Sequence, residues 1–325
     1  MDLVTAIENW RSIRRYETRP VPKETLLEVV SAARDALPLR PEIGIRWYTV
    51  WSGAALDRGL DRPFSPRATL GPAPHYVLAV SEKRPGYLEN LGFCMQQMML
   101  AATAHGLGTC WIRGRAEGEA GGEGEEDTQG DLSSTPKAQE EMHLHDTFDQ
   151  DALRGLTPDI APDEEIVALT PMGYPEISPR ARMARHLARW GTDQLGTRLP
   201  LRVTASRDTW AVPWAGQDET VDRVLSLAAL APSWGNTQPW HFVVGERSIL
   251  AAVLRPADDE RARHHRLDGG IAMCHFYLAA HASGRWPAGA RWRALIQAEL
   301  APLRTRYGVP PEYDMLALFP APEDT

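Results

Sequence analysis

The chain has 325 residues, of which 43% are hydrophobic, and it carries a formal net charge of −8. Its length suits one large domain or two modest ones, and its three cysteines form no CxxC pair, which argues against a disulfide framework or a structural zinc site. No apolar run approaches the ~18 residues of a membrane span, and the N-terminus shows no basic and apolar leader, so we expect a cytoplasmic protein without membrane contact.

The sequence pattern of the first half predicts helices that alternate with a few strands. An amphipathic helix over 27–38 ends at a proline and precedes an aromatic-rich strand at 45–51. A second strand at 75–80 leads into a long apolar helix at 92–106, and a later strand covers 165–175 before a basic helix. Mixed helices around few central strands favour an α+β layer fold.

The negative charge is concentrated in one stretch between these elements. Residues 116–150 contain eleven acids and one base, Lys137, so this stretch carries −10 and the rest of the chain about +2. It is rich in Gly, Glu and Ser, and we expect a disordered, solvated insertion without chemistry. The rest has no basic stripe with interleaved aromatic residues, which argues against nucleic acid binding.

The second half repeats the pattern in shortened form. A helix at 223–233 again ends at a proline, and an aromatic-rich strand follows at 239–244. The stretch "GIAMCHFYLAAHASG" (270–284) aligns without a gap with "GFCMQQMMLAATAHG" (92–106). Three similarities in the same order favour an internal duplication. The alternative is one helical enzyme in which buried helices share Leu and Ala by chance.

Several stretches together resemble the FMN-dependent nitroreductases. In the first half these are "WRSIRRYETRPVP" (10–22), "LGFCMQQMMLAATAHGLGTCW" (91–111) and "DEEIVALTPMGYP" (163–175). In the second half, "AALAPSWGNTQPWHFVV" (228–244) matches strongly. The two halves suggest a fused-repeat member that is similar to the TM nitroreductase subgroup.

The resemblance implies a particular division of the chain. Members of the family are normally homodimers with two FMN sites at the interface, each built from the arginine motif and Gly-rich turn of one subunit and the polar turn of the other. We therefore expect an α+β, nitroreductase-like fold in which two half-repeats, 1–200 and 201–325, form an intramolecular pseudo-dimer around central helices. The internal interface predicts a monomer.

The resemblance also assigns residues to the FMN phosphate. They are the basic and hydroxyl residues of the arginine motif and two arginines after "GYP", namely Arg11, Ser12, Arg14, Arg180 and Arg182. Guanidinium groups suit this role because they bind phosphate through paired, charge-assisted hydrogen bonds. Trp10 stands where the family has its first arginine. The alternative for each arginine is a solvated helix face.

The flavin ring is assigned to two turns. The polar turn supplies Pro232, Ser233, Asn236 and Gln238, of which Gln238 is more often structural; a self-satisfied turn at a helix C-terminus is the alternative. The Gly-rich turn, "GLGTCWIRG" (106–114), supplies Arg113 and Gly114. They stand in the place where the family lays a backbone N–H against N5 of the flavin. We expect the Arg113 side chain to point to solvent or to an acidic substrate.

Each turn has a counterpart in the other half that departs from the family pattern. Where the first half should carry the polar turn it has "ALPLRPEIGIRW" (36–47), and the second half has only "TASRDTW" (204–210) in place of the arginine motif. One complete FMN site per chain follows, and the second site is lost. The pairs "HLHD" (143–146) and "HH" (264–265) are interpreted as surface residues, and Cys110 as a small core residue.

The resemblance implies two-electron transfer. NAD(P)H would reduce the bound FMN, and a small-molecule electron acceptor such as a nitroaromatic or a quinone would take the electrons. No catalytic acid or base is evident in the motifs. The implied mechanism hardly needs one, because the flavin carries the chemistry and the protein positions it. The alternatives are a flavin-fragmenting or dehalogenating relative, a non-catalytic flavin-binding protein, and a structural protein without flavin.

Overall fold

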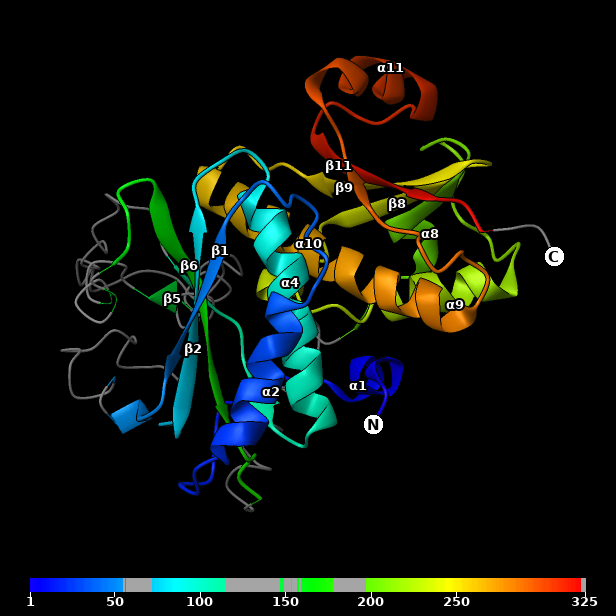
Figure 1. The fold of residues 1–325 in the computed structure, drawn as a ribbon. Coiled ribbons are helices and arrows are strands. Elements are labelled where there is room, and N and C mark those ends of the chain that lie inside the picture. The colour runs from blue at the N-terminus through cyan, green and yellow to red at the C-terminus, as the bar shows by residue number, and fades with distance from the viewer. Residues whose placement is uncertain are drawn as a thin grey trace, which may run out of the picture.

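The structure, a computed structural model, describes residues 1–54, 56, 72–114, 147–148, 153, 157, 159–177 and 197–322. Two long helices, α4 (Tyr87–Ala104) and α10 (Asp259–Ser283), pack against each other at its centre. One sheet lies on each side of this pair (Figure 1). No helix in the described ranges is long and apolar enough to cross a membrane. The arrangement confirms the α+β fold that the sequence predicted.

The first sheet has two almost fully buried strands at its centre. Besides α4, the first half of the chain contains the described elements α1 (Leu3–Asn9), α2 (Lys23–Arg34), β1 (Ile45–Val50), β2 (His75–Glu82), β3 (Gly108–Thr109), β4 (Ile112–Gly114), β5 (Thr147–Phe148) and β6 (Glu164–Gly173). The strand order is β1-β2-β6-β4-β5, with β3 also paired to β6. Almost every residue of β2 and β6 is buried, which explains their continuous apolar runs. Most of the acidic insertion lies outside the described residues.

The second sheet has the order β10-β11-β9-β8-β7. Besides α10, the second half of the chain contains the described elements α8 (Leu201–Thr204), β7 (Ala205–Arg207), α9 (Glu219–Ala228), η2 (Trp234–Asn236), β8 (Trp240–Val244), β9 (Ser248–Leu254), β10 (Arg293–Ala294), α11 (Gln297–Tyr307) and β11 (Tyr313–Pro320). Phe242, Phe276, Trp292 and Phe319 pack as an aromatic cluster between this sheet and α10.

The two halves share one topology. In each, a helix precedes two strands, a long central helix, one or more short strands and a final long strand. The antiparallel path β1-β2-β6-β4 of the first sheet therefore corresponds to β8-β9-β11-β10 of the second. This correspondence confirms the pseudo-dimeric fold. The position of the boundary, after residue 200, stays a prediction.

Two glycines allow the central helices to approach each other in a nearly two-fold manner. A Cβ on Gly92 would lie 2.4 Å from the carbonyl oxygen of Leu267, and a Cβ on Gly270 would lie 2.1 Å from that of Glu89. Both glycines touch the residue three positions before their counterpart, and 178 positions separate each equivalent pair. The contact is therefore reciprocal, as at the isologous interface of a dimer.

Strand β7 has no counterpart among the described strands of the first sheet. It pairs in parallel with β8, which corresponds to β1, and so forms an edge of the second sheet. The stretch 204–210, expected as a degenerate arginine motif, therefore extends a sheet. By contrast, Ser12 of the real motif bridges to Thr109 in β3. The two stretches are not structural equivalents.

Candidate functional site

The arginine motif lies directly on the Gly-rich turn. The backbone N–H of Ile13 donates to the carbonyl of Thr109 at 2.8 Å, and the indole N–H of Trp10 donates to the Thr109 hydroxyl at 3.2 Å. Trp10 thus anchors the motif to the turn. Arg11 is exposed, whereas Ser12 and Arg14 are half-buried.

The polar turn after α9 has an uncommon backbone. Gly235, Asn236 and Gln238 have φ values of 58°, 54° and 49°, in the left-handed region that favours glycine. Asn tolerates this region, but Gln adopts it at a cost, and such strain is often retained at functional sites. The backbone N–H of Gln238 donates to the Ser233 hydroxyl at 2.9 Å and closes the turn.

Gln238 has a structural role. Its side-chain oxygen accepts a hydrogen bond from the backbone N–H of Leu199 at 2.8 Å, and its amide donates to the carbonyls of Thr197 and Asn236. The side chain is buried and ties the polar turn to the segment that precedes α8. A contact between Gln238 and a flavin stays a prediction.

Arg198 contacts the polar turn and lies near enough to Arg11 for their charges to interact. Its guanidinium donates to the side-chain oxygen of Asn236 and to the carbonyl of Leu230, both at 2.9 Å. Desolvation and the nearby charge of Arg11 lower the pKa of Arg198 to about 10. In the part of the chain that the structure describes, neither Arg11 nor Arg198 has a carboxylate within ion-pair distance. Two neighbouring cations without a counter-charge suit an anionic ligand.

Sequence reasoning missed Arg198. It belongs to no motif, and its importance depends on the folding of the segment before α8 onto a turn that lies almost forty positions later. The other basic candidates beyond "GYP", Arg180 and Arg182, lie outside the described residues.

Arg113 takes a different position from the one expected. Its side chain is only 5% exposed, and its Nη2 donates to Oδ1 of Asp268 on α10 at 2.5 Å. The other oxygen of Asp268 accepts a hydrogen bond from the backbone N–H of Trp234 in the polar turn at 3.0 Å. The expectation that Arg113 faces solvent or substrate is therefore wrong. The residue pairs instead with the opposite half and connects β4 to the polar turn.

A second buried chain of polar groups crosses the centre behind these turns. The indole N–H of Trp111 donates to the Gln96 oxygen at 2.9 Å, and the Gln96 amide contacts Nε2 of His275 at 2.9 Å. Nδ1 of the same ring contacts the carbonyl of Leu227 at 3.2 Å. The ring therefore donates from Nδ1 and accepts at Nε2 as a neutral imidazole. Burial lowers the pKa of His275 to about 3.

The interpretation of the histidine pair at 264–265 is wrong, whereas that of Cys110 is confirmed. His264 and His265, interpreted as surface residues, are buried, because α10 begins earlier than the apolar pattern indicated and carries both into the interior. Among the described residues, no cluster of three His, Cys, Asp or Glu could hold a metal ion. Cys110 is buried, which confirms its assignment to the core.

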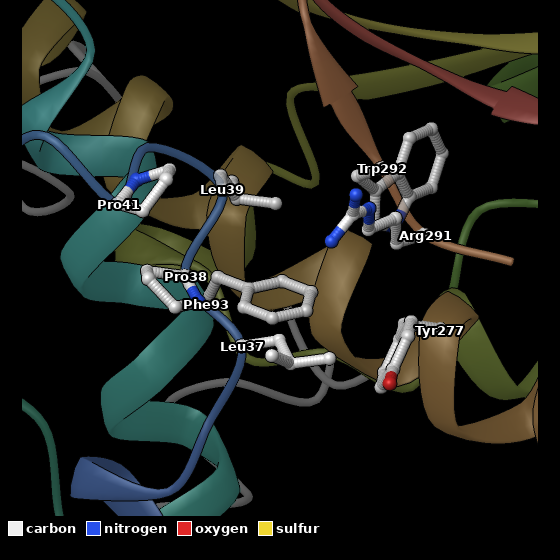
Figure 2. A pocket seen from close by; sticks show the side chains of 8 residues that line it. All are labelled: Leu37, Pro38, Leu39, Pro41, Phe93, Tyr277, Arg291 and Trp292. Atoms are coloured by element: carbon white, nitrogen blue, oxygen red, sulfur yellow. The ribbon is translucent and has the colours of Figure 1, made fainter. Parts of the chain in front are cut away.

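The counterpart of the polar turn lines a small cavity. Residues 37–41 follow α2 as the polar turn follows α9, and they enclose a cavity of about 80 Å³ (Figure 2). Its lining is mostly apolar and comprises Leu37, Pro38, Leu39, Pro41, Phe93, Tyr277, Arg291 and Trp292. Ligand sites for molecules of cofactor size usually have volumes of about 300 Å³ or more. The cavity is therefore too small for a flavin ring system.

A family model described as "Putative TM nitroreductase" matches residues 2–129 and 154–280, more than half of the chain. The chain belongs to this nitroreductase family. The interruption of the match, residues 130–153, overlaps the acidic insertion, and the matched residues include both the arginine motif and the polar turn. A solved nitroreductase from Thermotoga maritima has the same fold over 98% of this chain and 93% of its own, with 17% identity and a TM-score of 0.50.

Two curated proteins share shorter stretches with this chain, and both are named "Putative NADH dehydrogenase/NAD(P)H nitroreductase". The protein from Archaeoglobus fulgidus is 44% identical over 17% of this chain, and the protein from Methanothermobacter thermautotrophicus is 30% identical over 34%. These matches span 28% and 60% of the relatives' own lengths. A more distant solved nitroreductase, from Bacteroides fragilis, is titled as having bound FMN; it is 17% identical over 54% of this chain and 89% of its own, with a TM-score of 0.37.

Proposed function

We propose that this member of the family is an FMN-dependent oxidoreductase that passes electrons from NAD(P)H to a small acceptor such as a nitroaromatic or a quinone. The observation that carries the proposal is the position of Arg198. It is bonded to Asn236 of the polar turn and lies close to the charge of Arg11. Residues that are far apart in the sequence would thus form one cationic site at the junction of the two halves.

The described residues fit an FMN molecule in chemistry and in number. Arg11, Arg14 and Arg198 would hold the phosphate dianion together with the Ser12 hydroxyl, and Asn236 would contact the ring or the ribityl chain. The Gly-rich turn at Gly114 would bring a backbone N–H to the ring edge. When bound, FMN supplies the two-electron chemistry. The protein residues then position it, and the apolar centre excludes water.

The two halves support one FMN per chain and a monomer. The counterpart of the polar turn, residues 37–41, lines a cavity of about 80 Å³ that a flavin could not enter. The isologous contact of Gly92 and Gly270, which a homodimer would place between subunits, is internal. An obligate partner subunit is therefore unnecessary for a complete site. The names of the curated relatives support NAD(P)H as the electron donor.

The proposal is tested by purifying the full chain and measuring its absorbance, its released flavin and its mass by light scattering. We expect an oxidised flavin spectrum, one FMN per chain, a monomer of 36.1 kDa and bleaching by NADH or NADPH without air. Reoxidation in air should restore the original spectrum. A protein without flavin would reject the proposal, and two FMN per chain would reject the single site.

Two other outcomes would favour the alternative functions. Flavin that NAD(P)H does not reduce indicates a non-catalytic flavin-binding protein. Flavin that is destroyed when the reduced protein meets air indicates a fragmenting relative.

A further inference from the structure

The internal duplication provides a comparison for Asp268. Its counterpart on α4 is Asn90, at the same separation of 178 positions as the two contact glycines. Each side chain accepts a hydrogen bond from a backbone N–H of the segment after the preceding helix. Trp234 donates to Asp268 at 3.0 Å, and Arg40 donates to Asn90 at 2.9 Å. A neutral amide is therefore sufficient to hold such a segment.

The charge of Asp268 needs a further reason. Its side chain has no exposed surface, and removal of a carboxylate from water is costly unless a cation compensates it. That cation is Arg113, which is itself buried and which lies on β4 beside the Gly-rich turn. Asn90 has no such ion pair among the described residues, and the pair at Asp268 lies next to the turn where the flavin is proposed to bind.

The second terminal nitrogen of Arg113 points to a missing acceptor. Nη1 is buried and has no hydrogen-bond partner among the described residues, although Nη2 is bonded to Asp268. A buried guanidinium N–H without an acceptor is rare, because it loses its water and gains nothing in return. The residue is next to Gly114, whose backbone N–H is proposed to approach the flavin ring. A ligand bound there would supply the acceptor.

We propose that Asp268 positions Arg113 so that Nη1 donates a hydrogen bond to the edge of the isoalloxazine ring that gains negative charge on reduction. This inference rests on the proposed FMN function. Arg113 then favours the reduced cofactor over the oxidised one, while Asp268 acts only through Arg113 and through the backbone of Trp234. The contact is to the ring, so it does not depend on the phosphate.

The test compares Arg113→Met with Arg11→Ala in the full chain. Each apo-protein is titrated with FMN and with riboflavin, and the two-electron potential of each FMN complex is measured against reference dyes. Arg113→Met should weaken FMN and riboflavin by the same factor, about tenfold or more, whereas Arg11→Ala should weaken FMN alone. Arg113→Met should also lower the potential by about 30 mV for each tenfold loss of preference for the reduced flavin, and Arg11→Ala should leave it unchanged.

A second variant covers the case in which Arg113→Met does not fold. Arg113→Lys keeps a cation for Asp268 but has one nitrogen in place of the fork, so it should fold and show a smaller shift of the potential in the same direction. Unchanged potentials in the folded variants, with flavin bound, would overturn the inference and leave the proposed function intact. A wild-type chain that binds no flavin would overturn both.

Discussion

Replacement of Gly270 by Ala tests the contact on which the pseudo-dimer depends. The added Cβ would lie 2.1 Å from the carbonyl oxygen of Glu89, which is 1.3 Å less than the 3.4 Å of an ordinary contact. The atoms that it meets are backbone atoms of α4, so no side-chain rotation relieves the overlap. The helices must separate. Ala is preferred over Gly inside a helix by about 1 kcal/mol, but overpacking costs about 1–3 kcal/mol or more and acts here on rigid backbone.

We therefore expect Gly270→Ala to lower the free energy of unfolding by about 2 kcal/mol, and the midpoint of thermal unfolding by several degrees. The unfolding is followed by tryptophan fluorescence. Gly92→Ala should behave alike, because its Cβ would lie 2.4 Å from the carbonyl oxygen of Leu267. Gly289→Ala is the matched control, since no atom lies within 4 Å of its Cβ and its φ is not in the left-handed region. A Gly270→Ala protein as stable as the wild type, with unchanged flavin binding, would refute the argument for a close isologous contact.

Further predictions concern the flavin and a buried imidazole. Arg11→Ala and Arg14→Ala should each weaken FMN by roughly ten- to a hundredfold, from the ~1.5–3 kcal/mol of a charge-assisted contact, and should leave riboflavin unaffected in a fluorescence titration. Asn236→Ala should weaken FMN by roughly 1–3 kcal/mol in the same titration, while Arg207→Ala, at an exposed position of strand β7, should change nothing; the reverse result would contradict the placement of the flavin at the polar turn. His275 has a folded pKa of about 3 against an ordinary value of 6.5, so its stabilisation is complete above pH 6.5 and is lost as the pH falls toward 3. Denaturant titrations between pH 6.5 and pH 3 should show a decrease of about 5 kcal/mol in the free energy of unfolding, and this decrease should be smaller in His275→Gln. An equal pH dependence in the two proteins would contradict the assignment to His275.

The sequence was sufficient for the elements whose pattern is local. The strand predicted at 45–51 is β1, and the strand at 239–244 is β8, since aromatic and β-branched residues in short runs favour strands. The gap-free alignment of 92–106 with 270–284 located both central helices. The alignment missed the start of α10. This helix begins at Asp259, and its first turns are charged, so they carry no apolar signal. The strand β9, "SILAAVL", was not predicted, since a short run of Ala and Leu suits a helix equally well.

The site was predictable only as far as its motifs extended. The split between the arginine motif and the polar turn followed from the resemblance, and in the structure Arg198 bonds to Asn236 of the polar turn and lies near the charge of Arg11. No local pattern could show that Arg113 pairs with Asp268, because 155 positions separate them and a single Arg next to a glycine is common. That ion pair depends on the packing of α10 against the first sheet, which is a property of the folded chain alone.

The fusion of the two halves has an evolutionary consequence that the pair Asn90 and Asp268 illustrates. In a homodimer every substitution appears twice, so an acid introduced beside one cofactor is also introduced beside the other. Here one gene encodes the two positions separately, and a buried carboxylate stands at 268 while an amide stands at 90. One half is thus free to acquire features that its twin could not tolerate, and the twin can lose a binding site without loss of the whole protein. A duplicated chain can in this way specialise within a single molecule.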